Sequence, residues 1–425
     1  MRETKRYLVF IFVGFVSVVA TVAGWGADWY QFRGPTADGQ AGAARLPVHW
    51  SRTENIVWRQ EIPGKGWSSP VVAQRRIYLT TAVPEGNQGD QSLRALCLET
   101  ATGKVLWDVE VFHQKGASAP RIHPKNSHAS PTPVVDDGQL FVHFGHMGTA
   151  CLDAQTGRCL WRQQSLRYQP VHGNGGSPLL VGQHLIFCID GADQQWVVAL
   201  NRRDGSIAWR TPRNARAKKP FSFCTPTLIT VQGRQQVICP GSDVVMALDP
   251  VTGQEIWRVR YDGYSVVPRP VYAHGLVFVS TGYDVPVLYA IRPDGRRDVT
   301  HTHVVWMGKR GVPRNASPLV VGEYLYLAAD DGQITCLEAR NGREVWSERV
   351  GRAFSASPIH ADGRLYFCDE EGVTFVLKAG NTFEELARNR LQERILASPA
   401  VDGDALILRT EKALYRIAEP LASQR

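Results

Sequence analysis

The chain has 425 residues, of which 44% are hydrophobic and 21% are charged. This balance is typical of a folded protein and excludes a disordered or fibrous chain. The formal net charge is +8, and an excess this small, without a recognisable motif, predicts no nucleic-acid partner. The 12 Trp, 39 Gly and 25 Pro favour many short strands over long helices.

The first 27 residues have the pattern of a targeting segment. Three basic residues among the first six precede an apolar run over 7–23, and small residues follow before Asp28. We therefore expect a signal peptide over 1–27 and a periplasmic or secreted mature protein. The run is also just long enough for the alternative, an uncleaved N-terminal anchor, which would be the only membrane contact. Residues 28–49 then form a lead segment ahead of the next part of the chain.

One pattern recurs eight times between about residue 50 and the end of the chain. It begins with Ser, Thr or Arg before a Pro, and an apolar triplet starts seven residues later, as residues 77–79 follow Pro70. Because Pro is tolerated where a strand begins and no ladder donor is needed, each Pro marks a first strand. The eight prolines are Pro70, Pro133, Pro178, Pro226, Pro270, Pro318, Pro358 and Pro399.

Most units end on a second signature, a Gly followed four residues later by a Trp, as in Gly205 and Trp209. Gly suits a turn that requires a positive φ, and Trp is large enough to fill the wedge between neighbouring sheets. We predict that the Trp residues on the last strands dock one unit onto the next. These residues are Trp58, Trp107, Trp161, Trp209, Trp257, Trp306 and Trp346.

Repeats of about 45 residues with four short strands each are typical of a β-propeller blade. The eighth unit supplies only three strands, around Ala400, Ile407 and Tyr415, whereas residues 56–60 offer a spare strand with a Trp. A strand from one end that completes the blade of the other end closes the ring and removes two exposed edges. We therefore predict an all-β fold, a single eight-bladed β-propeller of four-stranded blades over 50–425.

The repeat signatures resemble the tryptophan-docking motif of PQQ-type propellers. The resemblance is carried by residues 247–257 (ALDPVTGQEIW), and residues 29–35 (WYQFRGP) and 66–70 (GWSSP) are similar to a secreted branch often labelled PQQ-binding-like or BamB-like. It covers nearly the whole mature chain. The fold that it implies hosts both enzymes and scaffolds.

The same resemblance implies which residues a quinoprotein dehydrogenase needs for its cofactor. Such enzymes stack the quinone PQQ between a Trp and a disulfide of two adjacent Cys, and Glu, Asn and Asp hold a calcium ion. This chain has eight Cys and no adjacent pair. We therefore expect no cofactor, and PQQ with calcium is the alternative.

Propeller loops place candidate binding residues at one mouth. The loops before the first strand and between the second and third strands gather on one face, where basic residues and carboxylates suit a polar ligand or a protein segment. The candidates are Lys125, Asn126, His128, His172, Asn174, Asp193, Tyr264, Arg269, Asp284 and Arg314.

Histidines are concentrated in one part of the chain, since five of the 12 lie between positions 123 and 172. Imidazole is a common metal ligand, which makes His123, His143 and His146 the candidates for a metal site. No pair among them has the spacing of a known metal motif, so we expect no metal.

The leading functional hypothesis is a non-enzymatic binding or scaffold protein whose loop face recognises an envelope protein or polymer. It assigns no catalytic residue. The alternative is an enzyme that uses the His-rich mouth, either a hydrolase or a PQQ-dependent dehydrogenase-like oxidoreductase. In the dehydrogenase, Lys125, His128 and Arg269 are the candidates for holding the quinone carboxylates.

Overall fold

The computed structural model describes residues 28–86 and 88–420. The expected signal peptide over 1–27 lies outside these residues. The described part of the chain contains no helix that is long and apolar enough to cross a membrane. Its helical content is two single 3-10 turns, η1 (Gly116–Ser118) and η2 (Gly145–Met147).

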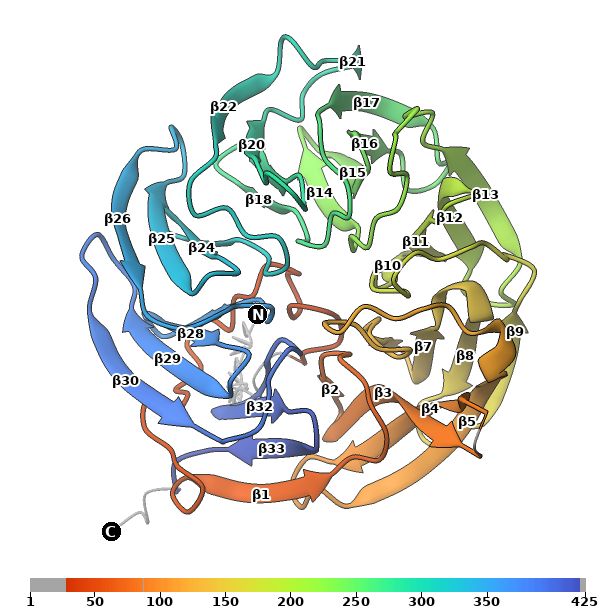
Figure 1. The fold of residues 1–425 in the computed structure, drawn as a ribbon, viewed down its shortest axis with the longest axis vertical. Coiled ribbons are helices and arrows are strands. Elements are labelled where there is room, and N and C mark those ends of the chain that lie inside the picture. The colour runs from red at the N-terminus through yellow and green to blue at the C-terminus, as the bar shows by residue number, and fades with distance from the viewer. Residues whose placement is uncertain (1–27, 87, 421–425) are drawn as a thin grey trace, which may run out of the picture.

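The strands form eight antiparallel sheets arranged around a central axis, which confirms the predicted eight-bladed propeller (Figure 1). Blades are numbered here in chain order, and each runs from the axis outward. Blade 4 carries a fifth strand, because β21 pairs in parallel with β17 at its outer edge.

Blade 1 consists of β2 (Val71–Ala73), β3 (Arg76–Glu85), β4 (Asp90–Glu99) and β5 (Val105–Gln114). Blade 2 consists of β6 (Val134–Asp136), β7 (Gln139–His143), β8 (Thr149–Asp153) and β9 (Cys159–Gln163). Blade 3 consists of β10 (Leu179–Val181), β11 (His184–Asp190), β12 (Gln195–Asn201) and β13 (Ile207–Pro212). Blade 4 consists of β14 (Thr227–Val231), β15 (Arg234–Gly241), β16 (Val244–Leu248), β17 (Glu255–Arg260) and the added β21 (Arg297–Asp298).

Blade 5 consists of β18 (Val271–Ala273), β19 (Leu276–Ser280), β20 (Leu288–Ile291) and β22 (Val304–Gly308). Blade 6 consists of β23 (Leu319–Val321), β24 (Tyr324–Ala328), β25 (Gln333–Glu338) and β26 (Glu344–Arg349). Blade 7 consists of β27 (Ile359–Ala361), β28 (Arg364–Cys368), β29 (Val373–Lys378) and β30 (Glu385–Arg390). Blade 8 consists of β31 (Ala400–Asp402), β32 (Ala405–Arg409), β33 (Ala413–Ile417) and β1 (Ile56–Glu61).

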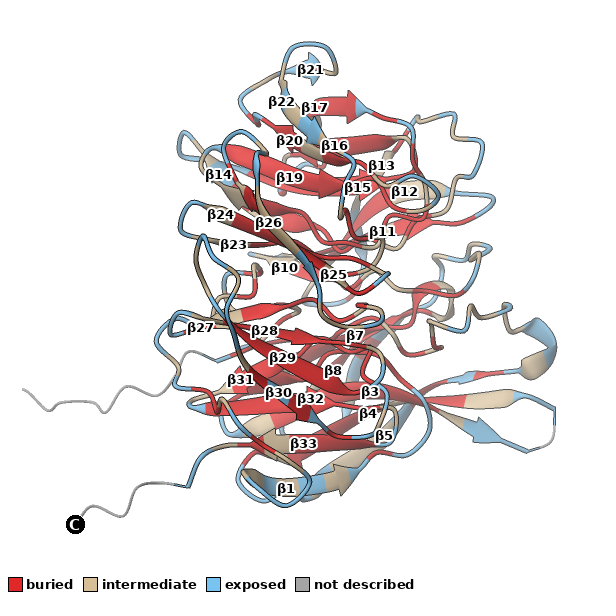
Figure 2. Cartoon of the chain, turned by 60° about the vertical axis from the view of Figure 1, so that its left-hand side comes forward, coloured by how far each residue is buried: buried red, intermediate tan, exposed pale blue. Residues whose placement is uncertain are grey.

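The core lies between the blades, and the middle strands supply most of it (Figure 2). All five residues of β16 and of β19 are buried, because both faces of a middle strand pack against neighbouring blades. The outermost strands are more exposed, as β9 and β26 show. This gradient explains why the second and third strands are continuous apolar runs in the sequence.

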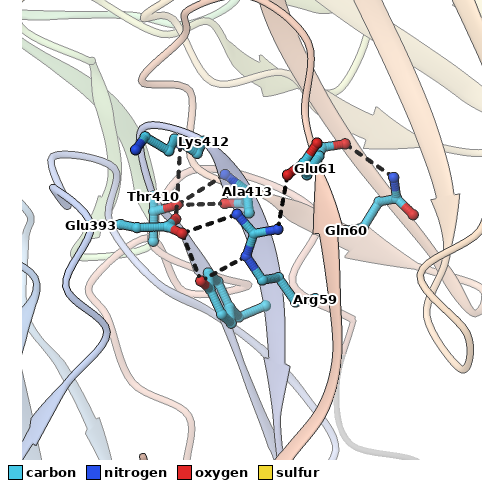
Figure 3. A network of polar contacts seen from close by, with 8 residues as sticks. Arg59, Gln60, Glu61, Glu393, Thr410, Lys412 and Ala413 are labelled. Carbon is cyan, nitrogen blue, oxygen red and sulfur yellow. Dashed lines mark hydrogen bonds and ion pairs between the residues drawn. The ribbon is translucent and has the colours of Figure 1, made fainter. Parts of the chain in front are cut away.

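Strand β1 closes the ring. It pairs antiparallel with β33 along Ile56–Glu61, as predicted, so blade 8 combines the two ends of the chain. Figure 3 shows a polar network at this seam, where Arg59 Nε donates to the Tyr415 hydroxyl at 2.9 Å and Arg59 Nη2 lies 3.0 Å from Glu393 Oε1. Burial raises the pKa of Glu393, but hydrogen bonds from Thr410, Arg59 and Tyr415 outweigh it and hold that pKa below its ordinary value.

A ring of Trp contacts joins neighbouring blades near the outside, as predicted. The indole of Trp161 in blade 2, for example, donates to the carbonyl of Arg202 in blade 3 at 2.9 Å and lies flat against Gly205. Equivalent indole-to-carbonyl bonds of 2.8 to 3.3 Å are made by Trp58, Trp107, Trp209, Trp306 and Trp346.

Two positions depart from this pattern. Trp257 is fully buried beneath β21 and donates to Gln236 of its own blade at 2.8 Å instead of to a carbonyl of the next blade. It still packs against blade 5, in one core cluster with Val277 and Ile291. In blade 7, Ala387 occupies the register position that Trp346 holds in blade 6. Trp50, from the segment before β1, is buried in the same core cluster as Ala387.

Candidate functional site

A chamber of about 390 Å³ lies on the propeller axis, on the face where the loops that lead into the first strands meet. Its lining comes from the approaches to all eight first strands and from the lead segment. The lining divides into a ring of hydroxyls, a floor, a loop across the mouth, and a cluster of aromatic rings.

The hydroxyl ring arises from the residue before the Pro that opens each blade. Seven of these eight positions hold Ser or Thr, and all seven side chains line the chamber. They are Ser69, Thr132, Ser177, Thr225, Ser317, Ser357 and Ser398.

This ring also fastens the blades together. The backbone N–H of Ser69 donates to the hydroxyl of Thr132 in the next blade at 2.9 Å. Five further steps repeat this contact at 2.8 to 3.0 Å, from Thr132 to Ser177, from Ser177 to Thr225, from Arg269 to Ser317, from Ser317 to Ser357 and from Ser357 to Ser398. An acceptor hydroxyl uses only a lone pair in this bond, so its own O–H stays available. Ser357 is an exception, because its O–H donates to the hydroxyl of Ser317 at 3.0 Å.

Arg269 holds the eighth position, and the structure places it away from the chamber. Its guanidinium is buried, with Nε donating to the carbonyl of Pro226 at 3.1 Å and Nη1 donating to the carbonyl of Phe32. Burial, together with the neighbouring Arg33, lowers the pKa of Arg269 to about 9. Arg269 therefore joins the lead segment to blades 4 and 5, and the expectation that it lines the mouth is not met.

The lead segment forms the floor of the chamber. Trp29 pairs with Val72 of blade 1, and Arg33 Nη2 donates to the carbonyl of Pro318 in blade 6 at 2.8 Å. Gln40 then reaches Val320 of blade 6, so the segment crosses the axis between these contacts. Phe32, in the middle of the crossing, lines the chamber.

The β5–β6 loop crosses the mouth at the other end, where it runs from the rim toward the axis (Figure 1). Lys125 on this loop places its Nζ 2.7 Å from Glu370 of blade 7 and 3.5 Å from Asp330 of blade 6. Burial lowers the pKa of Lys125, but these two carboxylates more than offset it and raise the pKa above its ordinary value. Asn126 fastens the same loop to blade 3, because its Nδ2 donates to the carbonyl of His172 at 2.9 Å.

Aromatic rings form one side of the chamber. Phe221 lies edge-on to His172 at 5.4 Å and to Tyr264 at 5.5 Å between centroids, and Phe223 is 6.1 Å away. His123 extends the cluster, since its ring lies 5.7 Å from that of His172. Edge-to-face pairs of this kind hold rings in fixed orientations.

The ten predicted mouth residues therefore separate into three groups. Four line the chamber, namely Lys125, Asn126, His172 and Tyr264. Three lie on the rim: the carboxylate of Asp193 accepts from the Gln169 N–H, Asp284 pairs with Lys219, and Arg314 donates to the Asp284 carbonyl. His128, Asn174 and Arg269 lie outside the lining, and Asn174 is buried against Tyr168 and His146.

Each His candidate for a metal site contacts a residue other than the remaining two candidates, and His123 Nδ1 accepts from the N–H of Lys125 at 3.2 Å. His143 is buried and bonds Thr149 at 2.8 Å, while His146 contacts the amide of Asn174 at 3.1 Å. Burial lowers the pKa of His143 to about 3 and that of His146 to about 4. The described residues contain one cluster with three candidate ligands, Glu85, Glu110 and His113, which is exposed at the far end of blade 1.

Sequence reasoning missed the hydroxyl ring, although its signal was present. The Ser/Thr-Pro pair that marks seven of the eight blades places one hydroxyl from each of them at the same radius. In the sequence that pair indicates where the first strands begin, whereas the predicted binding residues lie in the polar and charged loops. The floor residue Phe32 had no such signal, because its position depends on contacts with blades far away in the sequence.

The comparisons with known proteins assign the family. The family model that matches is described as outer membrane protein assembly factor BamB, and it matches residues 42–118, 94–302 and 287–412. The chain belongs to this family. The matches run from the lead segment to blade 8 and confirm the BamB-like resemblance of the repeats.

Individual relatives agree with this assignment. BamB of Shewanella oneidensis is 23% identical over 294 residues, which are 65% of this chain and 71% of that protein. The crystal structure of BamB from Moraxella catarrhalis covers 87% of this BamB-family chain and 98% of its own, with a TM-score of 0.62 and 13% identity.

The fold is also shared with quinoproteins. Quinohemoprotein alcohol dehydrogenase from Comamonas testosteroni has a TM-score of 0.64 at 11% identity, over 95% of this chain and 82% of that one. At this identity the likeness concerns the propeller fold, which hosts several functions.

Proposed function

We propose that the protein is a non-enzymatic scaffold that recognises an envelope partner through its loop face. The BamB family supports this role, because its named relatives are outer membrane protein assembly factors. The observation that carries the proposal is the state of the mouth carboxylates. Asp330 and Glu370 are both held by Lys125, and Asp330 also accepts from the amide of Asn315, so they fix loops in place and are poorly available for proton transfer.

The rim around the mouth provides the recognition surface. Lys219 lies 4.0 Å from the ring centroid of Tyr264 and also pairs with Asp284 at 3.3 Å, which joins the loops of blades 4 and 5 at the surface. A Tyr side chain held in place at a surface is a common anchor in protein interfaces.

Blade 1 adds a projection to the same face. Its strands β3, β4 and β5 have ten residues each, and Figure 2 shows their exposed ends extending beyond the body. In the projection His113 lies within 3.4 Å of both Glu85 and Asp90. The rim and this projection together would contact one partner protein, in a compartment that the targeting pattern of residues 1–27 places outside the cytoplasm.

Crosslinking in cells of the source organism tests the scaffold role. The full-length protein with a C-terminal tag is crosslinked and purified, and the bound envelope proteins are quantified by mass spectrometry. We expect a specific envelope protein whose recovery falls at least fivefold for Lys219→Glu. Val251→Glu, on the turn between β16 and β17 at the opposite face, is the matched control and should retain it. The proposal would be contradicted if the unchanged protein, Lys219→Glu and Val251→Glu recovered the envelope protein equally, or if no envelope protein were specifically crosslinked.

We also infer that the chain does not hold PQQ with calcium. By resemblance, the calcium of a quinoprotein is held by Glu, Asn and Asp. Here the Glu, Asn and Asp that meet at the mouth, Glu370, Asn315 and Asp330, are joined around the ammonium group of Lys125. A divalent ion would have to displace this ammonium, and a quinone with three carboxylates would lose Lys125 as a free counter-ion.

A calorimetric titration with PQQ and calcium tests this inference. We expect no saturable heat with the purified protein. Saturable micromolar binding at one site per chain would overturn it and would favour the dehydrogenase hypothesis.

A further inference from the structure

We propose that the central chamber binds a neutral saccharide unit. This goes beyond the scaffold role, because it concerns the chamber beneath the rim, and either function can exist without the other.

The hydroxyl ring supplies hydrogen-bond donors that the fold itself leaves unused. Thr132, Ser177, Thr225 and Ser398 each accept a backbone N–H from the preceding blade, and their own O–H groups find no acceptor among the residues that the structure describes. The hydroxyl of Ser69 has no hydrogen-bond partner there at all. These groups converge from five blades on one small volume, and each can both donate and accept, as sugar hydroxyls do.

The aromatic cluster supplies the apolar surface that a sugar ring also needs. Phe221, Phe223 and Tyr264 lie on one side of the chamber, where Phe221 packs edge-to-face with Tyr264 and at a tilt against Phe223. Trp67 lines the chamber as well, and its indole Nε1 is buried without an acceptor in the described chain. Flat apolar faces combined with a few fixed polar groups are the usual composition of a small-molecule site.

The electrostatics favour a neutral ligand. Among the described residues that line the chamber, Lys125 is the only Lys, Arg, Asp or Glu, and Glu370 and Asp330 already neutralise it. His123 also lines the chamber, and burial, with the nearby His172 and Lys125, lowers its pKa below the ordinary value, so it carries no charge at neutral pH. An anionic ligand would be desolvated there without a free cation to compensate it.

The dimensions limit the ligand to a small unit. A volume of 390 Å³ is near the lower end of the range of about 300–1,000 Å³ that is usual for small-molecule sites. Phe32 closes the chamber below, and the Lys125 loop narrows it above. A mono- or disaccharide, or the end of a glycan chain, fits this enclosure, whereas a folded protein segment does not.

Calorimetry and saturation-transfer NMR with the full-length protein test the proposal. The probes are glucose, galactose, mannose and N-acetylglucosamine, together with the disaccharides cellobiose and chitobiose and their tetrasaccharides. We expect saturable binding of at least one probe at one site per chain. Tighter binding of the tetrasaccharide than of the disaccharide would identify a chain end as the ligand, and equal binding would identify a free sugar.

Two variants locate the bound sugar. Ser69→Ala removes a chamber hydroxyl without removing an inter-blade bond, and Phe221→Ala removes the central ring of the aromatic cluster. We expect each to weaken binding at least tenfold. The matched controls are Ser118→Ala on the exposed turn η1 and Phe383→Ala beside Trp346, outside the chamber, and both should bind as the unchanged protein does. The proposal would be overturned if no probe bound, or if Ser69→Ala and Phe221→Ala both bound the sugar as tightly as the unchanged protein.

Discussion

Two concentric rings of contacts hold the blades together, and they differ in whether their side chains keep a hydrogen-bond donor without a partner. In the outer ring, the indole of a Trp donates to a carbonyl of the next blade and its face covers a Gly, as Trp161 does with Arg202 and Gly205. In the inner ring, a backbone N–H donates to a Ser or Thr hydroxyl of the next blade, as Thr132 does with Ser177. The indole has one donor and uses it, whereas the hydroxyl retains an O–H. The outer ring can therefore only hold the fold, while the inner ring also provides chemistry at the axis.

Gly205→Ala should lower the free energy of unfolding the most, because it disturbs the packing of an indole in the outer ring. The new Cβ would lie 2.5 Å from the ring of Trp161, at a φ of +73°. We expect about 2–4 kcal/mol less stability from the clash and the strained backbone. Denaturant unfolding measures this. Gly182→Ala has a φ of +56° but open space around the Cβ, and it should lose only about 1 kcal/mol. Equal losses would show that docking against the indole contributes nothing.

Ser177→Ala tests the inner ring. It removes the acceptor of the buried Thr132 N–H, and we expect a loss of about 1–2 kcal/mol in the free energy of unfolding. Ser69→Ala removes a hydroxyl of the same ring that accepts no such bond, so its free energy of unfolding should stay within about 0.5 kcal/mol of the original. If Ser69→Ala were as destabilising as Ser177→Ala, the inter-blade bond would not be the cause.

Stability should also depend on pH through His146 in the turn η2, whereas the described contacts of the outer ring involve no titratable side chain. Burial first, and then the charges of Arg167 and His128, lower the pKa of His146 to about 4. As the pH falls below about 6.5, the His146 imidazole takes up a proton in the unfolded chain but stays neutral in the folded chain. The free energy of unfolding therefore decreases between about pH 6.5 and pH 4. We expect His146 to lower the free energy of unfolding by about 1–2 kcal/mol between pH 7.5 and pH 5.

Unfolding curves across this pH range measure the effect. His146→Gln should flatten the slope, with the remainder due to His143, whose pKa burial lowers to about 3. Trp161→Phe, in the outer ring, should lower the free energy of unfolding by the same amount at pH 7.5 and at pH 5. An unchanged slope in His146→Gln would mean that its imidazole titrates normally in the folded protein.

Lys125→Met should have the smallest effect on stability, because its ion pairs lie at the mouth and are partly exposed. We expect a loss below about 1 kcal/mol. Amide hydrogen exchange should show the difference more clearly, with faster exchange confined to the β5–β6 loop. Unchanged exchange there would show that the contacts with Glu370 and Asp330 do not hold this loop across the mouth.

The sequence alone determined the repeat, the number of blades and the closure by β1. These features follow from local patterns, since a Pro begins a strand, a Gly permits a turn, and Trp58 marks the strand that blade 8 lacks. The same periodicity contained the hydroxyl ring, because each Ser or Thr stands at a fixed place next to its Pro.

Only the tertiary structure decided which residues depart from the repeat pattern and which residues close the two ends of the chamber. Lys125 meets Glu370 because a closed ring brings the loops of distant blades together over the axis. Phe32 becomes the floor because the lead segment crosses from blade 1 to blade 6, and Arg269 turns away from the chamber to bind the carbonyl of Phe32. These contacts join residues far apart in the sequence, and no local pattern encodes which side chains the closed ring will bring within reach.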